Sequence, residues 1–203
     1  YKRDAFVIYP PVDTKKFVLN NKKEEYYVTA GRLEPYKRVD LLVSAFNQIN
    51  DKLIIIGSGS QKKRLMKRAN NNIEFVEYSK PHKVYSIVSR AKAFLHAGIE
   101  DFGIAPVEAQ ACGTPVIAYG DGGALETVIN EKTGILFNDQ TPEAILAAIK
   151  RFNQTKFDYS QIRKNSERFS AENFERNFKR HILNKTKEWQ EKNKEDSQDI
   201  LSQ

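Results

Sequence analysis

The segment that decides the fold is YYVTAGRLEPYKRVDLLVSAFNQINDKLIIIG, residues 26–57. Two short apolar runs, YYVTA and KLIII, flank a stretch from Val39 to Ile49 whose apolar residues recur at helical spacing. Both runs are apolar nearly throughout, which is typical of strands covered on both faces. Such a strand–helix–strand unit predicts two parallel strands joined by a right-handed crossover.

The same alternation continues along the chain to about Phe152. IEFVEY, AFLHAG, PVIAYG and GILF are typical of further strands, whereas PHKVYSIVSRA, IAPVEAQAC and PEAILAAIKRF have helical character. We therefore expect residues 1–153 to form an α/β domain with a Rossmann-like, doubly wound parallel sheet.

Beyond residue 153 the sequence has a helical period. Ser170 is the expected N-cap of a helix that ends near Trp189. We expect residues 154–190 to form helices that pack back on the domain or toward a neighbouring domain, and residues 191–203 to form a disordered polar tail. The apolar stripe of these helices consists of Phe169, Phe174, Phe178, Ile182 and Trp189.

Composition limits the classes of protein and partner. The chain has 203 residues, 40% hydrophobic and 29% charged, which fits one ordinary globular domain. No apolar run is long enough to cross a bilayer. The single cysteine, Cys112, excludes an internal disulfide and favours a reducing, cytoplasmic compartment. A first residue of tyrosine rather than methionine indicates part of a longer protein.

The net charge of +7 and the sequence pI near 9.3 favour anionic partners. Nucleic acid, acidic lipid and phosphorylated small molecules all fit, and so does a merely solvated Lys-rich surface. A nucleic-acid module is disfavoured, because the Lys-rich segments lack interleaved aromatic residues.

Candidate binding residues follow the strands, where open parallel sheets bind ligands. YYVTAG is followed by Arg32 and, five residues on, by Lys37. Converging charges of this kind suit a diphosphate, although two solvated surface charges are the alternative.

Gly57 opens a GSGS turn that either contacts a ligand or only reverses the chain. This turn lacks the third glycine of the dinucleotide fingerprint, so NAD is not expected.

Glu100 and Glu108 stand seven residues apart in EDFGIAPVE. The letters DFG also occur in kinases, but no H-R-D loop and no V-A-I-K lysine accompany them. We expect Gly103 to turn the backbone before a helix that starts near Ile104, where exposed amides form an anion site. Glu100 and Glu108 can then accept hydrogen bonds from two different sugars of one ligand. A nucleotide sugar has two such rings with a diphosphate between them.

Several motifs together resemble the C-terminal domain of the retaining GT-B glycosyltransferases of family 4. They are PPVD, GRLEPYKRVDLLVSAF, E-x7-E, A-x-ACGTPVIA and GGALETV, in this order from Pro10 to about Phe137. The stretch EDFGIAPVEA and the later GGALETV are most similar to bacterial and archaeal mannosyltransferases of surface polysaccharide synthesis. The resemblance implies a metal-independent hexosyltransferase. Its donor is GDP-mannose or a UDP-sugar, and its acceptor is a glycan or a lipid-linked molecule.

The resemblance also implies roles for individual residues. Arg32 and Lys37 hold the donor diphosphate and stabilise the leaving group. Glu100 lies near the transferred sugar, and we group it with the two cations as the catalytic residues. Glu108 binds the ribose.

The other donor-binding residues implied by the resemblance contribute mainly backbone. The amides of Gly103 and Ile104 meet phosphate, and Gly31, Gly57, Phe102 and the segment Tyr78, Ser79 and Lys80 complete the site. Tyr78 stands where the family often has a glycine, which puts the contact to the base in doubt. His96 replaces a more common proline, and we interpret it as a strand-end residue rather than a catalyst.

The acceptor site of the resembling family belongs to an N-terminal domain that this sequence does not contain. We therefore expect the chain alone to bind the donor without turnover. The alternative within the same architecture is a sugar-nucleotide epimerase or hydrolase. The basic C-terminal helix is also expected to attract the protein to anionic membrane, as a peripheral protein on the inner face.

Overall fold

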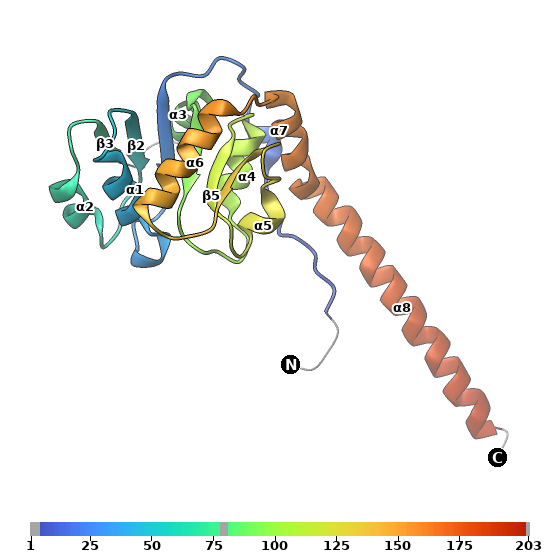
Figure 1. The fold of residues 1–203 in the computed structure, drawn as a ribbon. Helices are drawn as coiled ribbons and strands as arrows, with labels where there is room; N and C mark the ends of the chain where they lie inside the picture. The colour runs from blue at the N-terminus through green and yellow to red at the C-terminus, as the bar shows by residue number, and fades with distance from the viewer. Residues whose placement is uncertain (1–4, 78–80, 202–203) are drawn as a thin grey trace.

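A computed structural model describes residues 5–77 and 81–201 (Figure 1). All six strands are parallel and lie in one sheet in the order β3-β2-β1-β4-β5-β6. The chain starts at the centre of the sheet, moves to one edge, and then returns to build the other half, which confirms the doubly wound Rossmann-like arrangement. The strands are β1 (Tyr26–Ala30), β2 (Lys52–Ile56), β3 (Ile73–Val76), β4 (Ala93–His96), β5 (Val116–Tyr119) and β6 (Gly134–Phe137).

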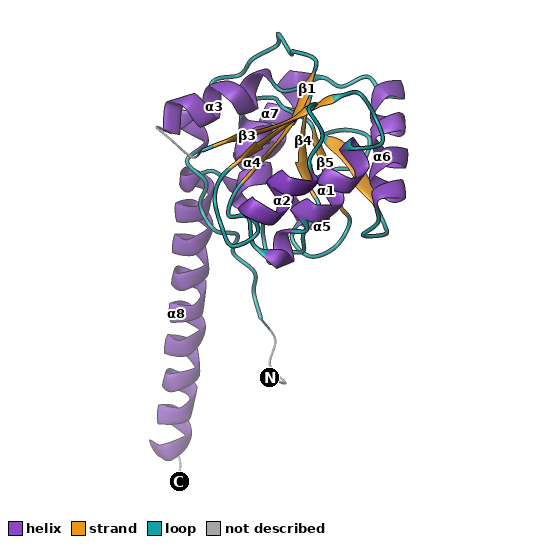
Figure 2. Ribbon diagram, turned by 90° about the vertical axis from the view of Figure 1, so that its left-hand side faces the viewer, coloured by secondary structure: helices purple, strands orange, loops and turns teal. Residues whose placement is uncertain are grey.

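Helices cover both faces of this sheet (Figure 2). One face packs against α1, α2 and α6, and the other against α3, α4 and α5. The bounds are α1 (Val39–Phe46), α2 (Lys62–Arg68), α3 (Pro81–Arg90), α4 (Ile104–Ala111), α5 (Ala124–Thr127) and α6 (Pro142–Gln154). The short apolar runs are therefore strands because both of their faces are buried, as their composition predicted.

The strand side chains alternate between two hydrophobic clusters. Tyr27 and Ile55 point into the cluster on the α1–α6 face, whereas Val28 and Ile56 point into the cluster on the α3–α4 face. All four side chains are at most 1% exposed. This period-two division fixes the register, because a slip by one residue would exchange the two faces.

The helix that follows α6 packs on the domain before the chain extends away from it. Asp158 caps α7 (Tyr159–Ser166) by accepting hydrogen bonds from the amides of Ser160 and Gln161. The helix α7 packs against α4, where buried Asn165 donates to the side-chain oxygen of Gln110 at 2.7 Å. Short 3₁₀ helices occur at Thr14–Lys16, Pro35–Lys37 and Glu167–Phe169.

The helix α8 (Ala171–Leu201) extends away from the domain, on the side where the N-terminal segment also leaves (Figures 1 and 2). The hydroxyl of Ser170 accepts from the amide of Asn173 at 3.3 Å, which confirms the expected N-cap. Our predicted helix end near Trp189 is wrong, and the helix runs through most of the segment expected to be disordered. The physical reason is that residues 190–201 contain no glycine or proline to end it.

The apolar stripe of the tail is divided between the domain and α8. Phe169 is 1% exposed in the core, whereas Phe178, Ile182 and Trp189 remain 47%, 47% and 66% exposed. None of the helices over residues 5–77 and 81–201 has both the length and the apolar character required to cross a membrane.

Candidate active site at the carboxyl ends of the central strands

The candidate site lies where the strand order reverses. β1 and β4 are neighbours in the sheet, yet their crossover helices lead to opposite edges, so the loops that follow them diverge and leave a crevice. A cavity of about 710 Å³ occupies this crevice. Seven of the predicted site residues line it: Gly31, Lys37, Glu100, Phe102, Gly103, Ile104 and Glu108.

Gly98 allows the two loops to meet. A Cβ atom at this position would lie 2.6 Å from the carbonyl oxygen of Tyr36 and 2.8 Å from the Cα of Lys37. These distances are far inside van der Waals contact, so only glycine fits. The close approach brings Lys37 next to the loop that carries Glu100. No motif gives Gly98 a role, although its place at the end of a predicted strand is a usable signal of a close backbone approach.

Lys37 and Glu100 form an ion pair across the crevice. Their side chains are 20% and 19% exposed, so both charges are partly withdrawn from water. A half-buried pair of this kind costs desolvation of both charges, which their mutual attraction offsets. An anionic group of a ligand can form an ion pair with Lys37 in place of Glu100, and hydroxyl groups of a ligand can donate hydrogen bonds to the carboxylate of Glu100. The pair therefore suits a ligand that carries both an anionic group and hydroxyl groups.

His96 lies beneath this ion pair at the end of β4. Burial, followed by the charge of Lys37, lowers the pKa of His96 to about 4. Its Nε2 atom is 3.9 Å from Oε2 of Glu100, which is too long for a hydrogen bond. At neutral pH the imidazole is therefore uncharged. This environment agrees with its interpretation as a strand-end residue.

The buried His96 makes stability depend on pH. The unfolded chain takes up a proton near pH 6.5, whereas the folded chain resists it until about pH 4. The uncharged folded imidazole costs no stability well above pH 6.5, but below this pH the folded state lacks the proton that the unfolded chain binds. We therefore expect the free energy of unfolding to fall by about 2 kcal/mol between pH 7 and pH 5. Urea denaturation of wild type and His96→Gln would measure the difference in pH slope.

The matched control for this prediction is His82→Gln, because His82 is exposed on α3. It should keep the wild-type pH dependence, and the His96 variant should have a shallower one. Identical slopes in wild type and His96→Gln would show that the imidazole is not responsible.

The N-terminus of α4 faces the same cavity. Gly103 has a φ of +84°, in the left-handed region that favours glycine, and it precedes the helix without a side-chain cap. Pro106 stands in the first turn, where its missing amide costs nothing. The amides of Ile104 and Ala105 thus lie at a helix N-terminus beside the cavity, which is a favourable environment for phosphate.

Glu108 lines the cavity from further along α4. Burial raises the pKa of its carboxyl, and the charge of Lys16 opposes this rise. The two glutamates therefore approach one cavity from different elements, Glu100 from the loop after β4 and Glu108 from the helix. Whether they contact two different rings of a ligand stays a prediction.

The loop after β5 supports the backbone that carries Glu100. The amide of Gly123 donates to the carbonyl oxygen of Glu100 at 2.7 Å. A Cβ atom on Gly123 would lie 2.3 Å from the Cα of Phe102, and one on Gly122 would lie 2.5 Å from the carbonyl oxygen of Glu100. This glycine pair is part of the motif GGALETV. In the structure it also sets the position of the Glu100 loop.

Five predicted site residues do not line the cavity or lie outside the described residues. Arg32 is absent from the cavity lining; its side chain is 80% exposed, with Nη2 3.9 Å from Oε1 of Glu34. Gly57 is required by a backbone approach, because its Cβ would lie 1.9 Å from the carbonyl oxygen of Gly31. The segment Tyr78–Lys80, expected to meet the base, lies outside the described residues.

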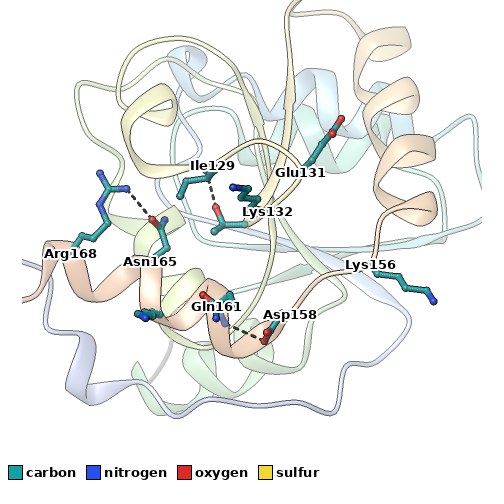
Figure 3. Close-up of a pocket in the computed structure, with 10 residues that line it drawn as sticks. Ile129, Glu131, Lys132, Lys156, Asp158, Gln161, Asn165 and Arg168 are labelled. Atoms are coloured by element: carbon teal, nitrogen blue, oxygen red, sulfur yellow. Dashed lines mark hydrogen bonds between the residues drawn. The ribbon is translucent and has the colours of Figure 1, made fainter.

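A second hollow, of about 570 Å³, lies at the other end of the sheet (Figure 3). It is bounded by the turn before β6 and by α7, and its cations include Lys132, Lys164 and Arg168. Its carboxylates are engaged: Glu131 pairs with Arg151 at 3.0 Å, and Asp158 caps α7. Parallel sheets bind ligands at the carboxyl ends of their strands, so this hollow is the weaker candidate. No group of three His, Cys, Asp or Glu residues suited to a metal occurs within 5–77 and 81–201.

Residues 12–169 match the family model of the group 1 glycosyl transferases, and the chain belongs to this family. One relative is a GDP-mannose-dependent alpha-(1-6)-phosphatidylinositol monomannoside mannosyltransferase of Mycolicibacterium smegmatis. It is 29% identical over 170 residues, which cover 69% of this chain and 44% of the relative. The chain spans less than half of the length of the curated relatives that it matches first.

Solved structures show the same fold. The lipopolysaccharide outer core galactosyltransferase WaaB matches with a TM-score of 0.78 and 21% identity, over 89% of this chain and 56% of that one. Anabaena HepE in complex with UDP-glucose matches with a TM-score of 0.72 and 22% identity, over 88% and 57% of the two chains. The chain therefore has the fold of about half of a GT-B glycosyltransferase, as the motifs predicted.

Proposed function

We propose that this chain is the donor-binding domain of a retaining hexosyltransferase of family 4. The observation that carries the proposal is the ion pair between Lys37 and Glu100 in the cavity between β1 and β4. It places a cation and a carboxylate beside the N-terminus of α4, within reach of one ligand. A nucleotide sugar presents a diphosphate to the cation and sugar hydroxyls to the carboxylate.

Each group has a distinct task in this mechanism. Lys37 meets the negative charge that develops on the leaving diphosphate, and the amides of Gly103 and Ile104 contribute from the helix start. Arg32 moves in from solvent when the diphosphate binds. Glu100 accepts hydrogen bonds from the transferred sugar.

GDP-mannose is the favoured donor, and a UDP-sugar is the alternative. The mannosyltransferase of Mycolicibacterium smegmatis supports the first, and the UDP-glucose complex of HepE supports the second. The acceptor is a glycan or a lipid-linked molecule, and its binding requires a second domain. Calorimetric titration of the protein with GDP, UDP and their hexose derivatives tests the proposal. Failure of every nucleotide to bind at millimolar concentration would refute it.

A sugar-nucleotide epimerase or hydrolase of the same architecture is the competing function. Such an enzyme would convert the donor without any acceptor. Incubation of the two-domain protein with the donor alone, followed by chromatography of the sugar products, separates the two functions. We expect no conversion until an acceptor is added.

We expect Glu100→Ala to weaken binding of the nucleotide sugar alone, and Glu108→Ala to weaken binding of both the nucleotide sugar and the nucleoside diphosphate. Glu100→Ala should weaken binding of the nucleotide sugar about tenfold and leave the nucleoside diphosphate unchanged, because its partner is the sugar. Glu108→Ala should weaken both ligands, because its partner is the ribose. Calorimetry of both variants with both ligands tests this division, and equal losses in all four titrations would contradict it.

A further inference from the structure

Three aromatic rings pack together directly behind the loop that carries Glu100. The ring centroids of Tyr9 and Phe102 are 5.9 Å apart, those of Tyr9 and Phe169 5.2 Å, and those of Phe102 and Phe169 5.3 Å. Val12 and Val107 complete this aromatic cluster. Phe102 is the member that belongs to the site loop, and the other two rings come from opposite ends of the chain.

The two outer rings belong to segments that are tied to each other. The amide of Val12 donates to the carbonyl oxygen of Phe169 at 2.8 Å, and Val12 also forms a parallel bridge with Ser170. Beyond the cluster, Phe6 stacks on His181 of α8 with ring centroids 4.6 Å apart. The N-terminal segment and α8 thus leave the domain together, on the same side (Figures 1 and 2).

The side chain of Tyr9 also lies near α5, the helix that follows the loop after β5. A hydrogen bond with Glu126, followed by burial, raises the pKa of Tyr9. Glu126 lies on α5, just after Gly123, whose amide holds the carbonyl oxygen of Glu100. The site loop is therefore held from two directions, by backbone contacts with the glycine pair and by ring contacts with Tyr9 and Phe169.

We propose that Tyr9 and Phe169 are positioning residues that hold Phe102, and with it the segment from Glu100 to Ile104, in the arrangement that binds the donor. A shift of the two tied segments would move these rings and therefore the loop. The part of this inference that concerns the donor rests on the proposed function.

Hydrogen exchange of the ligand-free protein tests the positioning role without any ligand. Tyr9→Leu removes the ring, and we expect about tenfold faster exchange of the amide of Gly123, which donates to the carbonyl oxygen of Glu100 in the site loop. Tenfold is the factor expected for the loss of an aromatic pair. Phe169→Leu should act in the same way. Tyr9→Phe keeps the ring and should stay close to wild type. Phe157→Leu is the matched control, because Phe157 stacks on Phe152 at 5.1 Å outside the cavity lining.

Calorimetry with GDP and UDP is the second measurement on the same variants. Tyr9→Leu should bind the preferred nucleoside diphosphate several-fold more weakly, whereas Tyr9→Phe and Phe157→Leu should bind it as wild type does. Unchanged exchange of the Gly123 amide in Tyr9→Leu would overturn the inference. Equal acceleration in β1 and β2 would also overturn it, because the effect would then be global. If wild type binds neither nucleotide, the proposed function fails while the exchange data still decide the positioning role.

Discussion

Replacing Lys37 by methionine is expected to weaken binding of a nucleoside diphosphate about 100-fold, or ~3 kcal/mol. Lys37 lines the cavity with a side chain that is only 20% exposed, so its charge acts in a poorly screened environment. Its removal deletes a charge-assisted contact with phosphate. It also leaves the carboxylate of Glu100 without its ion-pair partner. Calorimetric titration measures the loss.

Two variants serve as comparisons for Lys37→Met. Lys52→Met removes an equal charge at the start of β2, where Lys52 pairs with Glu74 at 2.8 Å, and should bind as wild type does. Arg32→Met removes the exposed cation of the same loop and should also cost affinity, because we propose that Arg32 moves in with the ligand. Unchanged affinity in Lys37→Met would remove the diphosphate from this loop.

Gly123→Ala is expected to destabilise the domain by about 3 kcal/mol and to weaken nucleotide binding as well. The added methyl group would lie 2.3 Å from the Cα and 2.4 Å from the carbonyl oxygen of Phe102. These are backbone atoms, so the whole loop must shift rather than one side chain. The shift would displace Glu100, whose carbonyl oxygen accepts from the amide of Gly123. Urea denaturation gives the stability, and calorimetry gives the affinity.

Gly120→Ala is the matched control for this substitution. Gly120 lies in the same loop, and its added Cβ would meet its nearest atom at 3.4 Å, the carbonyl oxygen of Phe137. This is an ordinary contact, so we expect little change in stability. Equal destabilisation by the two substitutions would mean that loop glycines matter for flexibility rather than for the close approach to Phe102.

The sheet could be predicted from sequence because its evidence is local. Continuous apolar runs such as KLIII show burial on both faces, and the helical stretches between them force parallel pairing. The sequence therefore predicts that the loops after the strands lie at the same edge of the sheet. Gly31, Lys37, Glu100 and Glu108 do line one cavity, and their roles stay predictions.

The supports of the site could not be predicted in the same way. Gly98 and Gly123 are needed because a Cβ atom added at either position would lie within 3 Å of backbone atoms from another part of the chain. Sequence periodicity carries no such information. Tyr9 belongs to no motif, and its role follows only from its contacts with Phe102 and Phe169. The exposed position of Arg32 likewise depends on the loop geometry, because Glu34 lies beside it.

The length of α8 differs from the prediction for another reason. Polar composition after Glu191 predicts disorder, yet polar residues without glycine or proline can continue a helix that has already been nucleated.

The central claim is that a nucleoside diphosphate binds between β1 and β4. The most direct test is a titration of the assigned amide NMR spectrum with GDP and UDP. We predict that one of them shifts the amides of Gly31, Gly103 and Ile104, and that Lys37→Met abolishes these shifts at the same ligand concentration. Shifts confined to the hollow around Lys132 and Lys164, or no shifts with either nucleotide, would contradict the claim.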